Sequence, residues 1–147
     1  GSALTADVVD ADGAFCGGII APGLRLFLDY LHERTERLPA IPFRPVRRPV
    51  GRSTEEAMRI GAWNGYRGLV RELAADLRRT LGPAVRFCAT GGDASRIRAV
   101  LGDSCRFVPN LTFEGMRMLY DWNPPPYGES MRPSRARHPQ PRTRHDA

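Results

Sequence analysis

Residues 3–33 read ALTADVVDADGAFCGGIIAPGLRLFLDYLHE, and this stretch predicts two strands followed by a helix. Residues 3–10 alternate apolar and polar positions as a strand does, and Asp12-Gly13 supplies the tight turn that a two-stranded hairpin favours. A second apolar strand is expected over residues 15–21. Pro22 then occupies the first turn of a helix that is expected to run to about Arg37.

The next segment is rich in proline and precedes the longest helical pattern of the chain. Four prolines, spaced three or four residues apart over 39–49, exclude a helix and favour an extended surface segment. Ser53 and Glu56 then form a capping box, S-x-x-E, which opens a helix expected to end near Leu81. The chain therefore passes from an extended connector directly into a long helix.

Three glycines interrupt this long helical pattern along one face, at Gly61, Gly65 and Gly68. Each glycine costs a helix about 1 kcal/mol relative to alanine, so we expect another element to pack closely against this face. A neighbouring helix and a subunit interface both satisfy that expectation.

The second half of the chain alternates strands and helices, which is typical of an α/β fold. The elements expected there are a buried strand, a short helix, a short strand and a final helix, over residues 84–90, 93–101, 105–108 and 111–122. After Asn123 the sequence is dominated by proline, arginine and serine without periodic apolar residues. We therefore expect one domain over residues 1–123 and a disordered basic tail over 124–147.

Composition limits the possible chemistry. The chain has 147 residues, of which 41% are hydrophobic and 26% charged, as in one globular domain. It contains no apolar run of the ~20 residues that a membrane span needs and no secretory pattern, so a cytoplasmic location without membrane contact is the default expectation. All 22 basic residues are arginine. This excludes the Walker A phosphate loop, the protein-kinase lysine and Schiff-base catalysis.

The net charge of +6 invites a nucleic-acid interpretation, which the distribution of charge disfavours. Residues 128–147 contain five arginines against Glu129 and Asp146, so +3 of the +6 lies in the tail. The body carries only about half of the excess, and nucleic acid is not expected as its partner.

Cysteine and histidine offer little for metal binding or nucleophilic catalysis. Cys16, Cys88 and Cys105 are odd in number, lie in apolar stretches and lack metal-ligand spacing, so buried reduced thiols are expected. His32 is the single histidine before the tail, which disfavours a histidine zinc site or a Ser/His triad. No metal-ligating residue is predicted.

Three glycine-containing turns are candidates for binding phosphate or adenosine: Gly1-Ser2, Gly17-Gly18 and Gly91-Gly92. A glycine pair between a strand and a helix lets backbone N–H groups and the helix N-terminus approach an anion closely. A plain strand-to-helix corner is the alternative for each. Asp93, directly after the last pair, either caps the following helix or approaches a ribose.

Together and in this order, five segments resemble type III pantothenate kinases. Residues 1–9 (GSALTADVV) look like the phosphate turn D-x-G-T-A-x-T-x-D-V-V, and residues 17–25 (GGIIAPGLR) match G-G-x-I-x-P-G-L. Residues 51–61 (GRSTEEAMRIG) are similar to G-x-[NS]-T-x-x-A-M-x-x-G, and residues 89–92 (ATGG) to A-T-G-G. Residues 111–116 (LTFEGM), with Tyr120 and Asn123 behind them, are similar to L-T-x-E-G-L. The likeness extends from residue 1 to about residue 123. Its specificity comes from five ordered segments, since each alone is weak.

The resemblance implies an actin-like (ribonuclease H-like) fold, built from two related α/β domains with ATP in the cleft between them. This chain is similar to the C-terminal domain, a mixed sheet with flanking helices. The first central strand of that sheet, which leads into the phosphate turn, is missing here. The strands over 3–10 and 84–90 are then expected to expose unpaired inner edges, unless they close on each other or borrow a strand.

The resemblance also implies ATP-dependent phosphorylation of pantothenate to 4′-phosphopantothenate, the first step of coenzyme A biosynthesis. Family members act as dimers with Mg²⁺ and a monovalent cation, K⁺ or NH₄⁺. Carried over by position, the ATP-binding residues are Gly1, Ser2 and Thr5 at the phosphates and Thr90, Gly91 and Gly92 at the adenosine, and the pantothenate contact, made across the dimer interface, is Thr54. No residue of this chain takes a catalytic role.

Departures from the family pattern imply that the chain is inactive alone. The aspartate of D-x-G-T would precede Gly1, and the first domain with its catalytic aspartate is also absent. Phosphoryl transfer depends on aligning donor and acceptor, which half a cleft cannot do. The expected partner is a chain carrying the N-terminal domain, or a second copy. A non-catalytic regulatory or binding remnant of the family is the alternative, and a tail that binds nucleic acid is a third hypothesis.

Overall fold

The computed structural model describes residues 2–102 and 105–123. Residues 1–112 form one compact unit, and a second unit begins at Phe113. The tail expected over residues 124–147 lies outside the described residues, as does Gly1.

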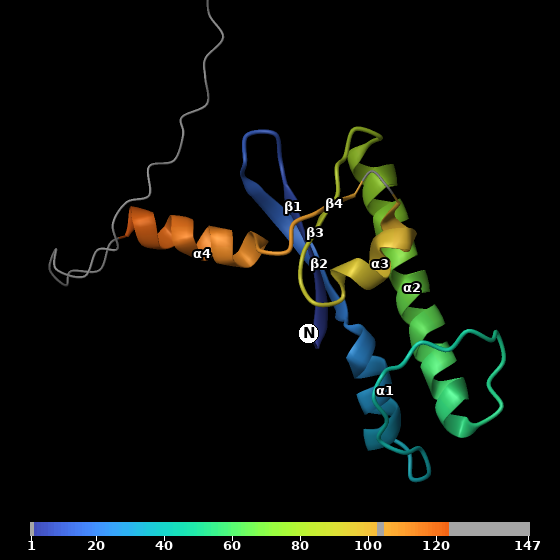
Figure 1. Cartoon of the computed structure of the whole chain (residues 1–147). Helices are drawn as coiled ribbons and strands as arrows, with labels where there is room; N and C mark the ends of the chain where they lie inside the picture. The colour runs from blue at the N-terminus through green and yellow to red at the C-terminus, as the bar shows by residue number, and fades with distance from the viewer. Residues whose placement is uncertain (1, 103–104, 124–147) are drawn as a thin grey trace, which may run out of the picture. The chain divides into compact units, whose positions relative to one another are not determined.

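The chain begins with the predicted hairpin (Figure 1). Strand β1, Ala3–Val9, pairs antiparallel with β2, Phe15–Pro22, in a register that places Ala3 opposite Pro22. The connecting turn is closed by Asp10, whose carboxylate accepts hydrogen bonds from the backbone N–H groups of Asp12 and Ala14 at 3.0 and 2.8 Å. The predicted hairpin is confirmed, but its connection spans residues 10–14 and is closed by these Asx-type hydrogen bonds rather than by a tight Asp12-Gly13 turn.

Helix α1, Leu24–Glu33, is shorter than predicted. The Arg34 N–H donates to the Tyr30 carbonyl at 3.0 Å and closes the last turn, and the Thr35 hydroxyl donates to the Leu31 carbonyl at 2.7 Å. The His32 ring Nδ1 lies 2.8 Å from the Leu38 carbonyl. These bonds hold residues 34–38 in an irregular turn, so the helix ends before Arg37.

Helix α2, Thr54–Leu81, begins at the predicted capping box. The Ser53 hydroxyl accepts from the Glu56 N–H at 3.2 Å, and the Glu56 carboxylate accepts from the Arg52 N–H at 2.8 Å. Gly82, with φ 89°, ends the helix. Local signals at both ends therefore define this element.

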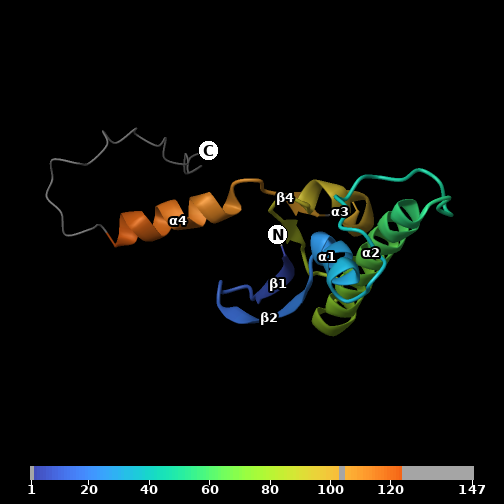
Figure 2. The ribbon, with the colours of Figure 1, turned by 90° about the horizontal axis from the view of Figure 1, so that it is seen from below.

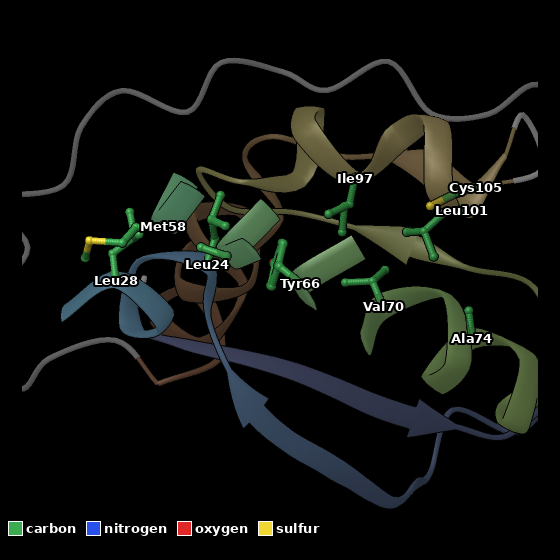
Figure 3. Close-up of a cluster of buried hydrophobic side chains, with 10 residues drawn as sticks. Leu24, Leu28, Met58, Tyr66, Val70, Ala74, Ile97, Leu101 and Cys105 are labelled. Carbon is green, nitrogen blue, oxygen red and sulfur yellow. The ribbon is translucent and has the colours of Figure 1, made fainter. Parts of the chain in front are cut away.

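The core lies between α2 and two shorter helices, α1 and α3, Ala94–Leu101 (Figure 2). Every fourth residue of α2 from position 58 to 74 is buried, which forms one stripe along the helix. The buried cluster drawn in Figure 3 comprises Leu24, Leu28, Met58, Ala62, Tyr66, Val70, Ala74, Ile97, Leu101 and Cys105.

The glycines of α2 have different surroundings. A Cβ built on Gly65 would lie 3.3 Å from Cε1 of Phe27 in α1, so this glycine permits close packing of the two helices. A Cβ on Gly61 or Gly68 would meet no atom within 4 Å in the part of the chain that the structure describes. Close packing against α1 therefore explains the glycine at position 65, but not those at positions 61 and 68.

The remaining strands are short. Strand β3, Cys88–Ala89, pairs parallel with β4, Arg106–Phe107, and this pair forms a sheet separate from the hairpin. The prediction of a long buried strand over 84–90 is therefore wrong, and among the described residues the expected mixed sheet is divided into two pairs of strands. A strand becomes longer when it pairs with neighbours on both edges, but among the described residues β3 pairs only with β4 and β1 only with β2. The inner edges of β1 and β3, which were expected to lack a partner, lack one within this part of the chain.

The final helix, α4, spans Leu111–Trp122, as predicted. Its end is capped by Asn123, whose backbone N–H and side-chain amide both donate to the Leu119 carbonyl at 3.0 Å. No helix that the structure describes is long and apolar enough to span a membrane.

The three cysteines are free, but only Cys105 is buried. Cys16 and Cys88 are exposed, so the prediction of three buried thiols is wrong for these two. A side chain on a strand is buried only where another element covers its face of the sheet, and the faces that carry Cys16 and Cys88 are open to solvent. Burial raises the pKa of the Cys105 thiol, and the nearby Cys88 raises this pKa further while Arg78 lowers it.

Candidate functional site

The start of β1 is fixed beside the start of α1. The Gly23 N–H donates to the Ser2 carbonyl at 2.9 Å, which joins residues 21 positions apart. Gly23 is the N-cap of α1 and has no side chain to cap the helix, and no acidic residue occupies the first turn. Ser2 and Thr5 are exposed. Ser2, the described residue of the first glycine-containing turn, therefore lies next to a helix N-terminus without a side-chain cap.

The Gly91-Gly92 turn leads from β3 into α3. Gly91 has φ 92°, a left-handed conformation that favours glycine, and its carbonyl accepts from the Ala94 N–H at 3.2 Å. Asp93 occupies the N-cap position, but its side chain makes no capping bond. It forms an ion pair with Arg96 at 3.0 Å instead, so the capping alternative for Asp93 is wrong.

A cavity of about 480 Å³ connects these two helix starts. It is lined by Leu24, Arg25 and Asp29 of α1, by residues 40–43, and by Asp93 and Arg96 of α3. Because Leu24 follows Gly23 and Asp93 follows Gly92, the cavity brings together segments about 70 residues apart in the sequence.

The cavity combines an apolar wall with two ion pairs. Arg25 and Asp29 are 3.4 Å apart, and the Arg96 guanidinium lies 5.2 Å from the centroid of the Phe43 ring. A planar group with polar substituents suits such a lining. Its flat face can stack on the Arg96 guanidinium or the Phe43 ring, and its substituents can form hydrogen bonds with the ion pairs.

Tyr66 belongs to the core and is influenced by Asp93, which lines the cavity. Burial raises the pKa of the Tyr66 hydroxyl, and the negative charge of Asp93 raises it further. The ring packs edge-on against Phe27, with centroids 6.5 Å apart. The phenol is therefore held neutral next to an acidic residue of the cavity.

The other predicted residues have different surroundings. The Thr90 hydroxyl donates to the Pro109 carbonyl at 3.3 Å, and this bond ties together the segments that follow β3 and β4. Gly92 is open, because a Cβ built on it would meet no atom of the described residues within 4 Å. The structure thus gives the Thr90 hydroxyl a structural partner and leaves the Gly92 backbone accessible.

Thr54 belongs to a separate feature, the start of α2. It is the first residue of that helix and is exposed. A Cβ on Gly51 would lie 2.5 Å from the Ala57 backbone nitrogen, so only glycine lets this segment fold against the first turn of α2. Thr54 does not line the cavity between α1 and α3.

Sequence reasoning missed the charged and aromatic lining of the cavity: Arg25, Asp29, Phe43 and Arg96. Arg25 falls within the motif at residues 17–25, and Arg96 lies four positions after the Gly91-Gly92 turn. Phe43 lies in the proline-rich segment and carries no local signal of its own.

Among the described residues, no group of three or more His, Cys, Asp and Glu side chains could hold a metal ion. The described part of the chain therefore provides no cluster of such side chains that would hold a divalent cation by itself.

Comparison with known proteins gives a consistent result. The family described as "Type III pantothenate kinase" matches residues 1–76. A type III pantothenate kinase of Methylacidiphilum infernorum is 42% identical over 121 residues, covering 81% of this chain and 45% of that protein. The corresponding protein of Acidiphilium cryptum is 41% identical over 138 residues, covering 94% of this chain and 51% of that protein.

A solved structure shares the fold. A Campylobacter jejuni protein, assigned by name to the Baf family of transcriptional activators, superimposes with a TM-score of 0.53 at 24% identity, covering 84% of this chain and 55% of that one. The chain spans about half the length of the curated relatives it matches. The family match extends over more than half of this chain, and the chain belongs to the type III pantothenate kinase family.

Proposed function

We propose that this chain forms the C-terminal half of an ATP-dependent pantothenate kinase, which converts pantothenate to 4′-phosphopantothenate in coenzyme A biosynthesis. The observation that carries the proposal is about 40% identity to type III pantothenate kinases over four-fifths or more of this chain, but over only half of theirs. We propose a cytoplasmic location, as expected for such a metabolic kinase.

The ATP site would lie at the two glycine turns. Ser2, Thr5 and Gly1 would face the phosphates, and Thr90, Gly91 and Gly92 the adenosine. The cavity between α1 and α3 supports this assignment, because it is lined by α1, whose N-cap Gly23 donates to the Ser2 carbonyl, and by α3, which follows Gly91-Gly92. Backbone N–H groups at the starts of both helices would stabilise negative charge there.

Arg96 and Phe43 would supply the surface for a flat base. Their stacked arrangement already places a delocalised cation on an aromatic ring within the cavity wall. The Asp93 carboxylate, which is not used as a helix cap, would accept a hydrogen bond from a ribose hydroxyl.

The other half of the cleft would come from a polypeptide that carries the N-terminal domain. The open inner edges of β1 and β3 support this arrangement, because an actin-like sheet would place one more strand between them. Dimerisation would bring Thr54 to the pantothenate of a neighbouring subunit, and its exposure at the start of α2 is compatible with that contact.

Magnesium and a monovalent cation are implied by the family. The described residues do not fit a metal cage, so we derive no step through either ion. What this half contributes is the positioning of the nucleotide and the substrate, which is the main requirement of phosphoryl transfer.

The test is ATP-dependent phosphorylation of pantothenate by this chain alone and after mixing with the half of the Acidiphilium cryptum protein that it does not match. We expect turnover only in the mixture. Thr54→Ala should lower that turnover at least about tenfold, because a hydrogen bond to substrate is lost. Thr80→Ala, an exposed threonine at the other end of α2, is the matched control and should leave it unchanged.

Two outcomes would contradict the proposal. Turnover by this chain alone would show that no second half is needed. ATP binding without turnover in a mixture that forms a stable complex would favour the alternative, a non-catalytic binding or regulatory member of the family.

A further inference from the structure

A second concave surface lies at the start of α2, on the extended segment that precedes this helix. It is open to solvent, has a volume of about 530 Å³ and is lined by Arg44–Arg48 together with Glu56 and Arg59 of α2. It shares no lining residue with the cavity between α1 and α3. The two cavities are therefore separate, and the assignments made above do not involve this one.

Two of its four arginines have partners. The Arg59 guanidinium lies 2.8 Å from the Glu55 carboxylate, and its Nε donates to the Pro42 carbonyl at 3.2 Å. Arg48 lies 3.8 Å from the Glu56 carboxylate. These contacts neutralise one end of the cavity and fix the extended segment to the first turns of α2.

Arg44 and Arg47 are exposed and form no ion pair or hydrogen bond with any residue that the structure describes. Since Glu56 offsets Arg48 and Glu55 offsets Arg59, the cavity retains two positive charges. The prolines of this segment restrict its backbone, and both Arg44 and Arg47 line the cavity.

We propose that this cavity binds the dianionic phosphate group of a small molecule through Arg44 and Arg47. A guanidinium presents a rigid fork of donors that matches phosphate oxygens in pairs, so two of them match both the charge and the acceptor number of a phosphate monoester. A carboxylate or sulfonate carries a single negative charge and leaves one of the two positive charges uncompensated. The site is therefore selective for a dianion.

The test uses two probes of the same shape and different charge, phenyl phosphate and benzenesulfonate. Binding to the full chain is measured by titration calorimetry at pH 8 and constant ionic strength, where the phosphate, with a second pKa of about 6, is a dianion. We expect phenyl phosphate to bind roughly tenfold more tightly than benzenesulfonate.

The double variant Arg44→Gln/Arg47→Gln should bind phenyl phosphate roughly tenfold more weakly and no longer distinguish the probes. The matched control is Arg71→Gln/Arg86→Gln, which removes the same two charges at exposed positions outside the cavity. It should change the affinity less than about twofold.

Equal weakening by both double variants would overturn the proposal, because the attraction would then be a general effect of net charge. Unchanged binding by the Arg44→Gln/Arg47→Gln variant would also overturn it, since phenyl phosphate would then bind elsewhere. Arg44→Lys/Arg47→Lys keeps the charge and loses the fork; an intermediate affinity supports bidentate recognition, and full affinity contradicts it. Because the assay needs neither ATP nor pantothenate, its result is independent of the kinase proposal.

Discussion

Replacement of Leu28 by alanine should destabilise the unit of residues 1–112 far more than the same replacement at Leu26, two positions away in α1. Leu28 is 2% exposed and packs into the core against α2, whereas Leu26 is 39% exposed. Both substitutions remove the same atoms from the same helix. The difference between them therefore measures burial and packing rather than helix propensity.

The expected magnitudes follow from these exposures. Leucine to alanine removes three methylene-sized groups, about 2.4 kcal/mol of transfer free energy when the side chain is fully buried. At Leu28 the cavity left behind adds to this, for a total of about 3–4 kcal/mol. At Leu26 the side chain is partly solvated and water fills the space, so about 1 kcal/mol is expected.

The assay is urea unfolding of the full chain, followed by circular dichroism at 222 nm and by tryptophan fluorescence, in a Trp122→Phe background so that Trp63 alone reports. With a slope of about 2 kcal/mol/M, Leu28→Ala should lower the midpoint by about 1.5–2 M and Leu26→Ala by about 0.5 M. Equal shifts for the two variants would refute the reasoning, because the burial of Leu28 against α2 would then contribute nothing to stability. A changed slope would instead report a change in the unfolded or native ensemble.

The remaining predictions concern two local contacts and one titration. Gly51→Ala should lower the free energy of unfolding by about 1–3 kcal/mol, because the new Cβ would lie 2.5 Å from the Ala57 nitrogen. Gly61→Ala should raise the free energy of unfolding by about 0.5–1 kcal/mol, because a Cβ there would meet no described atom within 4 Å and alanine favours a helix. If thermal unfolding shows changes of the same sign for the two variants, the geometric argument is wrong. Ser53→Ala should cost about 1 kcal/mol through loss of the cap to the Glu56 N–H, and no shift in the urea midpoint would exclude that role. The folded pKa of Tyr66 is raised above its ordinary value of 10.0, so the stability that the neutral phenol contributes is complete below pH 10 and is lost as pH rises through the folded pKa. Tyr66→Phe should therefore flatten the fall of Tm above pH 10. An unchanged alkaline profile of Tm would show that Tyr66 does not cause this fall.

Elements with local signals could be predicted from the sequence. The hairpin is specified by Asp10 and its own turn, and α2 by the Ser53 cap at one end and Gly82 at the other. In each case the deciding hydrogen bonds join residues at most four positions apart, so the sequence around the position contains the information. The family likewise followed from five short segments in order.

The candidate site was predictable only in part. The glycine turns and Thr54 could be found because they fall in recognisable motifs, but the cavity lining could not. Phe43 and Arg96 meet across 53 residues, and Asp93 pairs with Arg96 rather than capping α3. Such choices depend on which side chains the fold brings within reach.

By itself the sequence determined the hairpin, the long helix with its ends, the family and the positions of the glycine turns, because each depends on neighbours along the chain. Tertiary structure decided the short length of β3, the division into two sheets, and the two cavities beside residues 40–48. The physical reason is that a strand needs a partner across its edge and a cavity needs walls from distant segments. Neither is encoded within a local window of residues.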